Sequence, residues 1–298
     1  MNESIPYLGE FFALATALIW AIAVILFKKS GEKVHPLALN AFKSILALVL
    51  LVPTAYLFGQ KLNYPAPLNE YLLLLFSGAL GVGIGDYLFF KGLNKLGASL
   101  SSIAGCSYSP IIIGLSMIIL GERFTILQAL GTALIIGAIV ATSGEIRLGN
   151  ISRRDLALGV TWTILANLAN GLGIVLVKPI LERSPLFWAT EIRLLGGVIV
   201  IILFLLFNPR KKALFESLTK TGRWTYTISG SLVGTYLAMV LWLAGMKYAQ
   251  ASTAAVLNQT SHVWVFLFAA FLLREKMNIQ RIIAIAVASA GVFLVATG

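Results

Sequence analysis

Charged residues are scarce in this chain of 298 residues, since 12% are Asp, Glu, Lys or Arg while 58% are apolar. An ordinary soluble domain carries about 25% charged residues, so this chain has too little polar surface to face water on all sides. These proportions exclude a soluble globular domain and indicate a membrane protein that the lipid bilayer surrounds.

The residues that form disulfides and metal sites are few as well. Cys106 is the single cysteine, which excludes an intrachain disulfide. The two histidines are His35, between apolar segments, and His262, within one, and no cluster of cysteines or carboxylates accompanies either. We therefore expect neither a metal nor a cofactor.

Uncharged stretches recur along the whole chain, and each can cross about 30 Å of hydrocarbon if a flanking turn is added. Lipid offers the backbone no hydrogen-bond partner, and the stretches do not alternate as barrel strands do, so helices must carry the crossings. We predict an all-α membrane protein with ten transmembrane helices, in the stretches 11–27, 44–60, 71–85, 96–121, 124–144, 156–177, 194–209, 224–246, 248–273 and 282–298.

A degenerate internal repeat divides these helices into two sets of five. Shifting the chain by 153 residues superimposes identical residues: Gly81 on Gly234, Gly92 on Gly245 and Glu122 on Glu275. Because five is an odd number, the second half must enter the membrane from the opposite side, which defines inverted-topology repeats. We predict a first five-helix repeat over 1–145, a cytoplasmic linker over 146–154 and a second, inverted repeat over 155–298.

The basic residues indicate the orientation of these helices. If ten spans alternate, sixteen of the 23 Lys and Arg residues fall on one side and five on the other, while Lys43 and Arg193 lie inside spans. Positive charge collects on the cytoplasmic side, so we expect a multi-pass protein of the cell (inner) membrane with both termini outside the cytoplasm. Topology thus explains the net charge of +11, and we expect no nucleic-acid partner.

Small residues predict which helices pack together, because close approach replaces the hydrophobic effect between helices in lipid. Ala133 and Gly137 share their spacing with Ala286 and Ala290, at matching places in the fifth and tenth spans. We expect these last helices of the two halves to pack on each other. Pro110 lies within the fourth span and predicts a kink there.

Each half closes on a Gly/Arg-Glu-basic sequence and an apolar helix, as in Gly121-Glu-Arg and Arg274-Glu-Lys. A basic residue, Lys43 or Arg193, also stands early in the second helix of each half. Together with the two five-span halves, this pattern resembles the EamA-type branch of the drug/metabolite transporter superfamily over practically the whole chain. The resemblance implies a ten-helix transporter with a central cavity built by both halves, for amino acids, other metabolites or drugs.

One feature departs from the superfamily's short multidrug members, which carry a proton-binding glutamate about two turns before the basic end of their first helix. Counted from Lys28, that place is Trp20, and counted from its repeat equivalent Lys178 it is Asn170. The departure argues against proton-driven drug antiport.

Polar and aromatic side chains at mid-membrane depth are the candidate binding residues, because an unpaired polar group there is costly. Gln259 and His262 lie three residues apart on the ninth span, and the 153-residue shift places them over Cys106 and Ser109. The predicted substrate-binding residues are Trp20, Cys106, Ser107, Ser109, Asn167, Asn170, Trp242, Asn258, Gln259 and His262. The alternative is that these side chains only pack or hydrogen-bond between helices.

Charged residues inside spans are candidates for ion coupling or for structural ion pairs, and they are Lys43, Asp86 and Arg193. Asp86 either binds a proton or cation or neutralises Lys43 or Lys91. Glu275, at a turn between spans, is expected to cap a helix end rather than to contact a substrate.

We therefore predict a secondary transporter, exporting small metabolites such as amino acids or other amphipathic solutes. Alternating access would expose the cavity by rocking 1–145 against 155–298. We expect a monomer with a small-molecule substrate and no enzymatic activity. The alternatives are a channel, a receptor, or an intramembrane protease, because Gly83-Ile-Gly-Asp86 matches GxGD. Such a protease needs two carboxylates, and the only other aspartate, Asp155, stands beside the linker.

Overall fold

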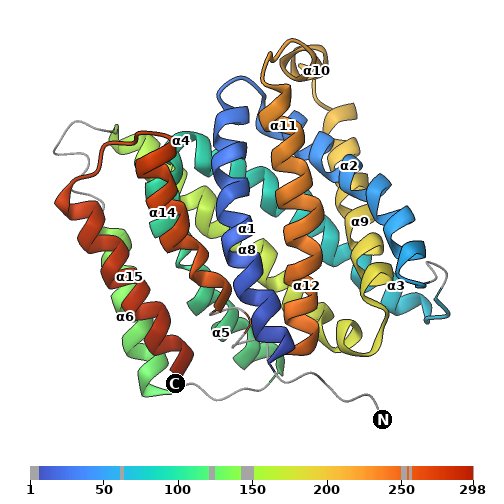
Figure 1. Cartoon of the computed structure of the whole chain (residues 1–298), viewed down its shortest axis with the longest axis horizontal. Helices are drawn as coiled ribbons and strands as arrows, with labels where there is room; N and C mark the ends of the chain where they lie inside the picture. Colours follow the sequence, from blue (N-terminus) through green and yellow to red (C-terminus); the bar gives the residue numbers. More distant parts are fainter. Residues whose placement is uncertain are drawn as a thin grey trace.

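A computed structural model describes residues 7–60, 64–120, 125–141, 151–249, 254 and 257–297. The regular structure of these residues is entirely helical (Figure 1). The first half contains α1 (Leu8–Gly31), α2 (Pro36–Leu57), α3 (Leu68–Gly78), the π-helix η1 (Ala79–Gly85), α4 (Asp86–Gly105), α5 (Tyr108–Leu120) and α6 (Ile126–Ala141). The second contains α8 (Arg153–Arg183), α9 (Leu186–Leu206), α10 (Lys211–Thr219), α11 (Trp224–Gly230), the π-helix η2 (Ser231–Ala238), α12 (Met239–Tyr248), α14 (Ser261–Leu272) and α15 (Ile279–Thr297).

Length and apolar composition qualify six of the described helices to cross a membrane, and four shorter apolar helices accompany them. Local residues set where these helices begin. Pro36 occupies the first turn of α2, where its missing N–H costs nothing, and the Nδ1 of His35 accepts from the N–H of Leu37 at 3.2 Å. At the start of α8, the Ser152 hydroxyl accepts from the N–H of Asp155 at 3.0 Å.

The helices repeat in the order that the sequence predicts. A shift of 153 residues moves η1 onto residues 232–238, which η2 covers, and α6 onto residues 279–294, which α15 covers. A π-helix is a rare element, so its occurrence at equivalent places in both halves supports a duplicated unit.

The two repeats run through the bundle in opposite directions. The start of α1 at Gly9 lies against Ala249, which follows α12. Lys247, near the end of α12, donates to the carbonyl of Ser184, which follows α8. The start of α1 and the end of α8 therefore lie at the same end of the bundle, the lower end in Figure 1. The first helices of the two halves, α1 and α8, therefore run in opposite directions through the bundle.

The first helix of each half packs against the third helix of the other half. A Cβ atom on Gly9 of α1 would lie 2.5 Å from the backbone nitrogen of Ala249, so these chains touch directly. In the other half, a Cβ atom on Gly159 of α8 would lie 2.5 Å from the Leu96 side chain. Gly9 and Gly159 are 150 residues apart and Leu96 and Ala249 are 153 apart, so the two contacts are repeat equivalents.

Two lysines repeat the same contact at opposite ends of the bundle. Lys28 donates to the carbonyls of Leu93 at 3.3 Å and Asn94 at 3.4 Å, just before Gly97 divides α4 into two arms, and Lys178 donates to those of Met246 at 2.9 Å and Ala249 at 3.3 Å, at the end of α12. The last carbonyls of a helix have no intrahelical partner and carry partial negative charge, so a cation stabilises them.

The first two helices of each half pack on the other half, which differs from the expected division into two separately packed bodies. Helices α1 and α2 pack on η2, whereas α8 and α9 pack on η1. Contacts therefore cross the boundary between the two sequence halves, and residues 1–145 are not packed as a body separate from 155–298. Of the predicted linker 146–154, residues up to 150 lie outside the described part of the chain.

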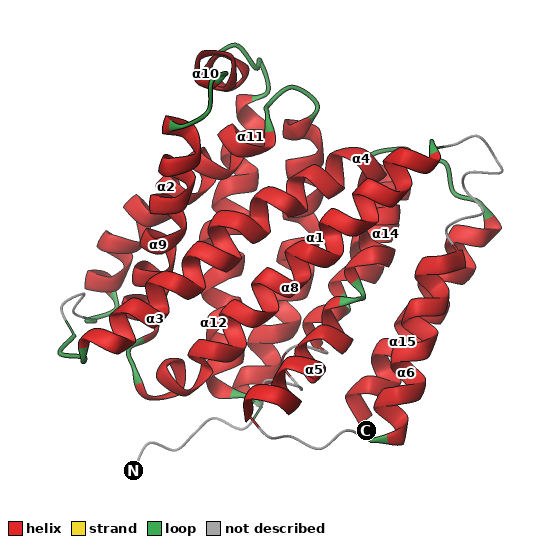
Figure 2. Ribbon diagram, turned by 180° about the vertical axis from the view of Figure 1, so that it is seen from behind, coloured by secondary structure: helices red, strands yellow, loops and turns green. Residues whose placement is uncertain are grey.

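Helices α6 and α15 lie side by side at one edge of the bundle, as both views show (Figures 1 and 2). A Cβ atom on Gly291 would lie 2.6 Å from the carbonyl oxygen of Gly131, so the two backbones are in contact. This packing of the last helices of the halves confirms the prediction from their small residues.

The predicted fourth and ninth spans, over 96–121 and 248–273, are each interrupted by a turn, and the turn in the fourth lies close to Pro110, where a kink is predicted. Gly97 has a φ of 77°, a left-handed conformation that glycine tolerates, and it separates the two arms of α4. A turn at Cys106 and Ser107 then separates α4 from α5. In the second half a turn at Thr260 precedes α14.

Pro110 explains part of the first break. It stands in the first turn of α5, where the N–H groups have no intrahelical partner, so its missing donor is tolerated there but would not be in a continuous helix.

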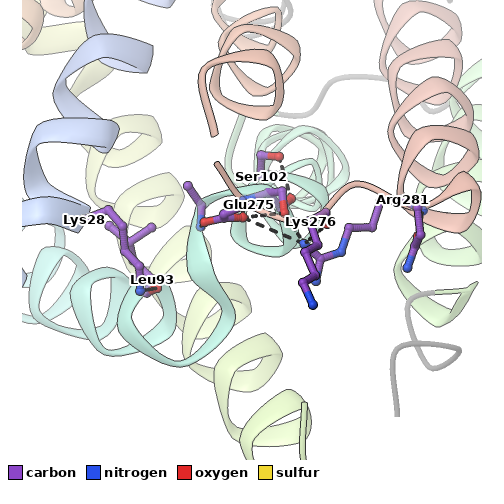
Figure 3. A network of polar contacts seen from close by, with 9 residues as sticks. Lys28, Leu93, Ser102, Glu275, Lys276 and Arg281 are labelled. Carbon is purple, nitrogen blue, oxygen red and sulfur yellow. Dashed lines mark hydrogen bonds and ion pairs between the residues drawn. The ribbon is translucent and has the colours of Figure 1, made fainter. Parts of the chain in front are cut away.

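A carboxylate caps the helical arm that follows Gly97, as Figure 3 shows. Glu275, between α14 and α15, accepts from the backbone N–H of Ala98 at 2.7 Å, that of Ser99 at 3.1 Å and the Ser99 hydroxyl at 2.7 Å. Arg281 donates to the same hydroxyl at 2.9 Å. The predicted capping role of Glu275 is confirmed, whereas Glu122 lies outside the described residues.

Replacing Glu275 by alanine should lower the free energy of unfolding by about 2 kcal/mol, because three charge-assisted hydrogen bonds are lost. Hydrogen–deuterium exchange at residues 98–105 should rise with it. Glu216→Ala is the matched control, since the exposed Glu216 carboxylate forms its ion pair with the exposed Lys220, which follows the same helix. Unchanged exchange at 98–105 in the Glu275 variant would show that the cap does not stabilise this arm.

Replacing Gly196 by alanine should destabilise the crossing of α9 over α3 by about 1–3 kcal/mol, because the new methyl group would lie 2.0 Å from the Leu75 carbonyl oxygen. Gly114→Ala has open space around the added methyl group and should leave stability unchanged or slightly raised. Thermal unfolding of both variants in detergent measures the difference, and equal midpoints would contradict the close contact.

Candidate functional site

A cavity of about 190 Å³ lies inside the bundle and is lined by both repeats. Its walls come from α1, α2, η1, α4 and α5 of the first half and from α8, α9, η2, α12 and α14 of the second, whereas α6 and α15 contribute no described lining residue. Ten of the residues singled out in the sequence line it: Trp20, Lys43, Asp86, Asn167, Asn170, Arg193, Trp242, Asn258, Gln259 and His262.

Three other predicted binding residues do not line the cavity. Cys106, Ser107 and Ser109 are buried at the break between α4 and α5. The Cys106 thiol donates to the carbonyl of Ser102 at 3.5 Å, and the Ser107 hydroxyl accepts from Asn167 at 2.9 Å. In the first half, Cys106 and Ser107 therefore hydrogen-bond at the helix break instead of lining the cavity.

Asn167 connects this break to the cavity wall. Its Nδ2 donates to the carbonyl of Gly105 at 3.1 Å as well as to the Ser107 hydroxyl. A carbonyl freed by a helix break in hydrocarbon needs a partner, and Asn167 of α8 supplies one across the repeat boundary. Both predicted roles of Asn167, helix contact and cavity lining, are thus compatible.

Asn170 lies one turn further along α8, against the π-helix of the first half. Its Nδ2 donates to the carbonyl of Ala166 on its own helix at 3.1 Å. A Cβ atom on Gly85 would lie 2.5 Å from that nitrogen, so glycine is needed for α8 to approach η1 at this depth.

The second break leaves polar atoms without partners. The Oδ1 of Asn258 and the Oε1 of Gln259 are buried and accept no hydrogen bond from any described residue. His262 packs beside them on the first break, since a Cβ atom on Gly105 would lie 2.4 Å from its Cε1. Buried acceptors beside a cavity are available to a bound solute or water.

Two tryptophans that line the cavity pack against other aromatic rings. Trp20 packs against Phe89 with ring centroids 5.7 Å apart, and Trp242 meets Tyr108 edge-on at 6.4 Å. Trp188, in the first turn of α9, lies outside the cavity lining and is fully buried between Tyr64 and Tyr71.

Asp86 forms an ion pair with Lys43 at 2.6 Å, which is one of the two partners that the sequence left open. Lys91, the other, lies over the ring of Trp162 at 3.9 Å. Asp155 bonds Lys95 at the surface, so the two aspartates hold different partners and do not share a proton. The GxGD match therefore lacks the paired carboxylates of a protease.

The cavity also contains polar residues that the sequence reasoning missed. Thr16 and Thr163 line it, and each stands four residues before a predicted lining residue on the same helix, Trp20 and Asn167. Helical periodicity counted backwards from those residues could have found both.

The chain belongs to the EamA-like transporter family, which residues 7–144 and 157–297 match as two successive copies. The family and its transporter-named relatives indicate a membrane transporter rather than an enzyme.

Three relatives resemble it over most of their lengths. An uncharacterized transporter of Archaeoglobus fulgidus is 22% identical over 95% of this chain and 93% of its own. One from Methanothermobacter thermautotrophicus is 24% identical over 96% and 85%, and a WAT1-related protein of Arabidopsis thaliana is 23% identical over 95% and 87%. A solved crystal structure shares the fold, with a TM-score of 0.68, 15% identity and 96% coverage of both chains.

Asn167→Ala should lower the thermal midpoint more than Asn170→Ala does. The first variant leaves the Gly105 carbonyl at a helix break without its partner, at a cost of about 1–3 kcal/mol, whereas the Ala166 carbonyl that Asn170 bonds belongs to an unbroken helix. Thermal unfolding of the two purified variants tests this order, and an equal or reversed order would contradict the bridging role.

Proposed function

We propose that this chain is a secondary transporter that exports small amphipathic metabolites, such as amino acids, by alternating access through the central cavity. The observation that carries the proposal is the lining of one cavity by two inverted repeats, each with a broken helix beside it. Inverted repeats and discontinuous helices around a central site are the construction typical of secondary transporters.

In this proposal the four shorter apolar helices also cross the bilayer, which brings the crossings to ten. Helices α5, α6, α14 and α15 run alongside the six longer ones in the bundle (Figure 2). The end of the bundle that carries α10 faces the cytoplasm, because the basic residues Arg210, Lys211 and Lys212 lie there.

The exchanged packing suggests which bodies move. We propose that α1 and α2 move with α11, η2 and α12, while α8 and α9 move with α3, η1 and α4. Rocking between these two sets would open the cavity alternately at each end without breaking the glycine contacts within a set.

Proteoliposomes loaded with a panel of labelled amino acids test this function. A transporter should give saturable uptake and counterflow, whereas a channel gives flux without counterflow, and a receptor gives neither. The absence of saturable flux for every solute in the panel and for the aromatic carboxylate named below would contradict the proposal.

Gln259→Ala should reduce that flux by about tenfold without lowering stability, because the Gln259 Oε1 has no described partner to lose and is available to the solute. Gln280→Ala is the control, since Gln280 is exposed on α15, which does not line the cavity. Unchanged flux in the Gln259 variant would remove this residue from the site.

A further inference from the structure

The two repeats place a cation at the same position but only one of them supplies its counter-ion. Lys43 and Arg193 are 150 residues apart, the spacing that also relates Gly9 to Gly159. Lys43 bonds Asp86 at 2.6 Å. The residue 153 positions after Asp86 is Met239, so the second half has a thioether where the first has a carboxylate.

Arg193 consequently lies in the cavity without a bonded anion. It is buried at 7% exposure, and its Nε has no hydrogen-bond partner. Among the described residues no carboxylate pairs with its guanidinium. The bonded partner of Asp86 is Lys43. Of the lining residues that the structure describes, the charged ones are Lys43, Asp86 and Arg193, which gives one positive charge in excess.

An unpaired cation inside a membrane protein is expensive to keep, and evolution retains such groups mainly where they bind something. The guanidinium lies beside η1, since a Cβ atom on Gly81 would be in ordinary van der Waals contact with an Nη atom of Arg193, at 3.7 Å. A guanidinium presents planar pairs of donors that match the two oxygens of a carboxylate.

We propose that Arg193 binds the carboxylate of an organic anion, which occupies the place that Asp86 fills in the first repeat. This inference rests on the proposed transport function and names its substrate class. The apolar part of the anion would lie against the aromatic walls of Trp20 and Trp242, since both line the same cavity.

Three compounds with one carbon skeleton test the charge preference on the wild-type protein: 3-phenylpropionate, 3-phenylpropionamide and 3-phenylpropylamine. Thermal stabilisation in detergent should show that the carboxylate binds about tenfold or more tightly than the amide, and that the amine binds weakest. Acetate and chloride should not compete, because neither fills the aromatic part of the cavity. Equal binding of the three compounds, preference for the amine, or no binding of the carboxylate would overturn the proposal.

Met239→Asp provides a sharper test, because it restores the missing carboxylate of the second repeat. The new aspartate should neutralise Arg193 and reduce binding of 3-phenylpropionate by about tenfold or more. Met239→Asn has nearly the same shape without the charge and should retain the preference for the carboxylate. Wild-type preference in the aspartate variant would contradict the proposal.

Arg193 variants complete the test. Arg193→Gln should lose the preference for the carboxylate, whereas Arg193→Lys should retain part of it. Arg183→Gln, which removes an arginine paired with Glu70, should change nothing in the series. Should Arg193→Gln fail to fold, the wild-type series and the Met239 pair still decide.

Binding and transport are measured separately, so the two proposals can fail independently. Carboxylate-selective binding without counterflow of 3-phenylpropionate in proteoliposomes would refute transport and leave the anion site standing. Saturable flux of solutes that ignores charge and survives Arg193→Gln would refute the anion site and leave transport standing.

Discussion

Direct backbone contact between the repeats is the constraint on which the rest of this structure depends. Lipid provides no hydrophobic drive between helices, so the helices of the two halves must hold together by close approach. Gly9, against the backbone of Ala249, and Gly159, against the Leu96 side chain, allow this approach at equivalent places, and each joins the first helix of one half to the third helix of the other. Because the halves exchange helices in this way, the cavity between them has walls from both.

The second constraint is that every backbone carbonyl in hydrocarbon needs a partner. Breaking the fourth and ninth spans frees carbonyls at the level of the cavity, and the two halves differ in the hydrogen bonds that form at the break. At the first break, the side chain of Asn167 donates to the freed carbonyl of Gly105. At the second, the side-chain oxygens of Asn258 and Gln259 have no partner among the described residues. The same asymmetry holds for charge, since Lys43 has Asp86 and Arg193 has no equivalent acid. The two repeats share one helix arrangement, and the differences between them at these positions leave Arg193, Asn258 and Gln259 available to a solute.

Much of this arrangement was predictable from the sequence, because the repeat survives in a few glycines and acids. The inverted topology, the pairing of α6 with α15 and the cap by Glu275 follow from that repeat. Pro110 indicated a kink in the fourth span, whereas the exact place of that break at Ser107 and the break at Thr260 were not predictable, since both lie inside uncharged runs. The sequence also does not show which neighbour each face of a helix packs against. The charge pattern alone left Asp86 open to two lysines, and the burial of Trp188 depends on Tyr64 and Tyr71 from a distant segment.

Membrane sidedness of two equivalent residues tests the inverted architecture most directly. Lys95 and Tyr248 are 153 residues apart, and both have exposed side chains near helix ends. In a Cys106→Ser background, single cysteines at these two positions can be labelled with a membrane-impermeant maleimide in vesicles of known orientation. Inversion predicts that Lys95→Cys reacts only from the cytoplasmic side and Tyr248→Cys only from the opposite side. Labelling of both from the same side would contradict it.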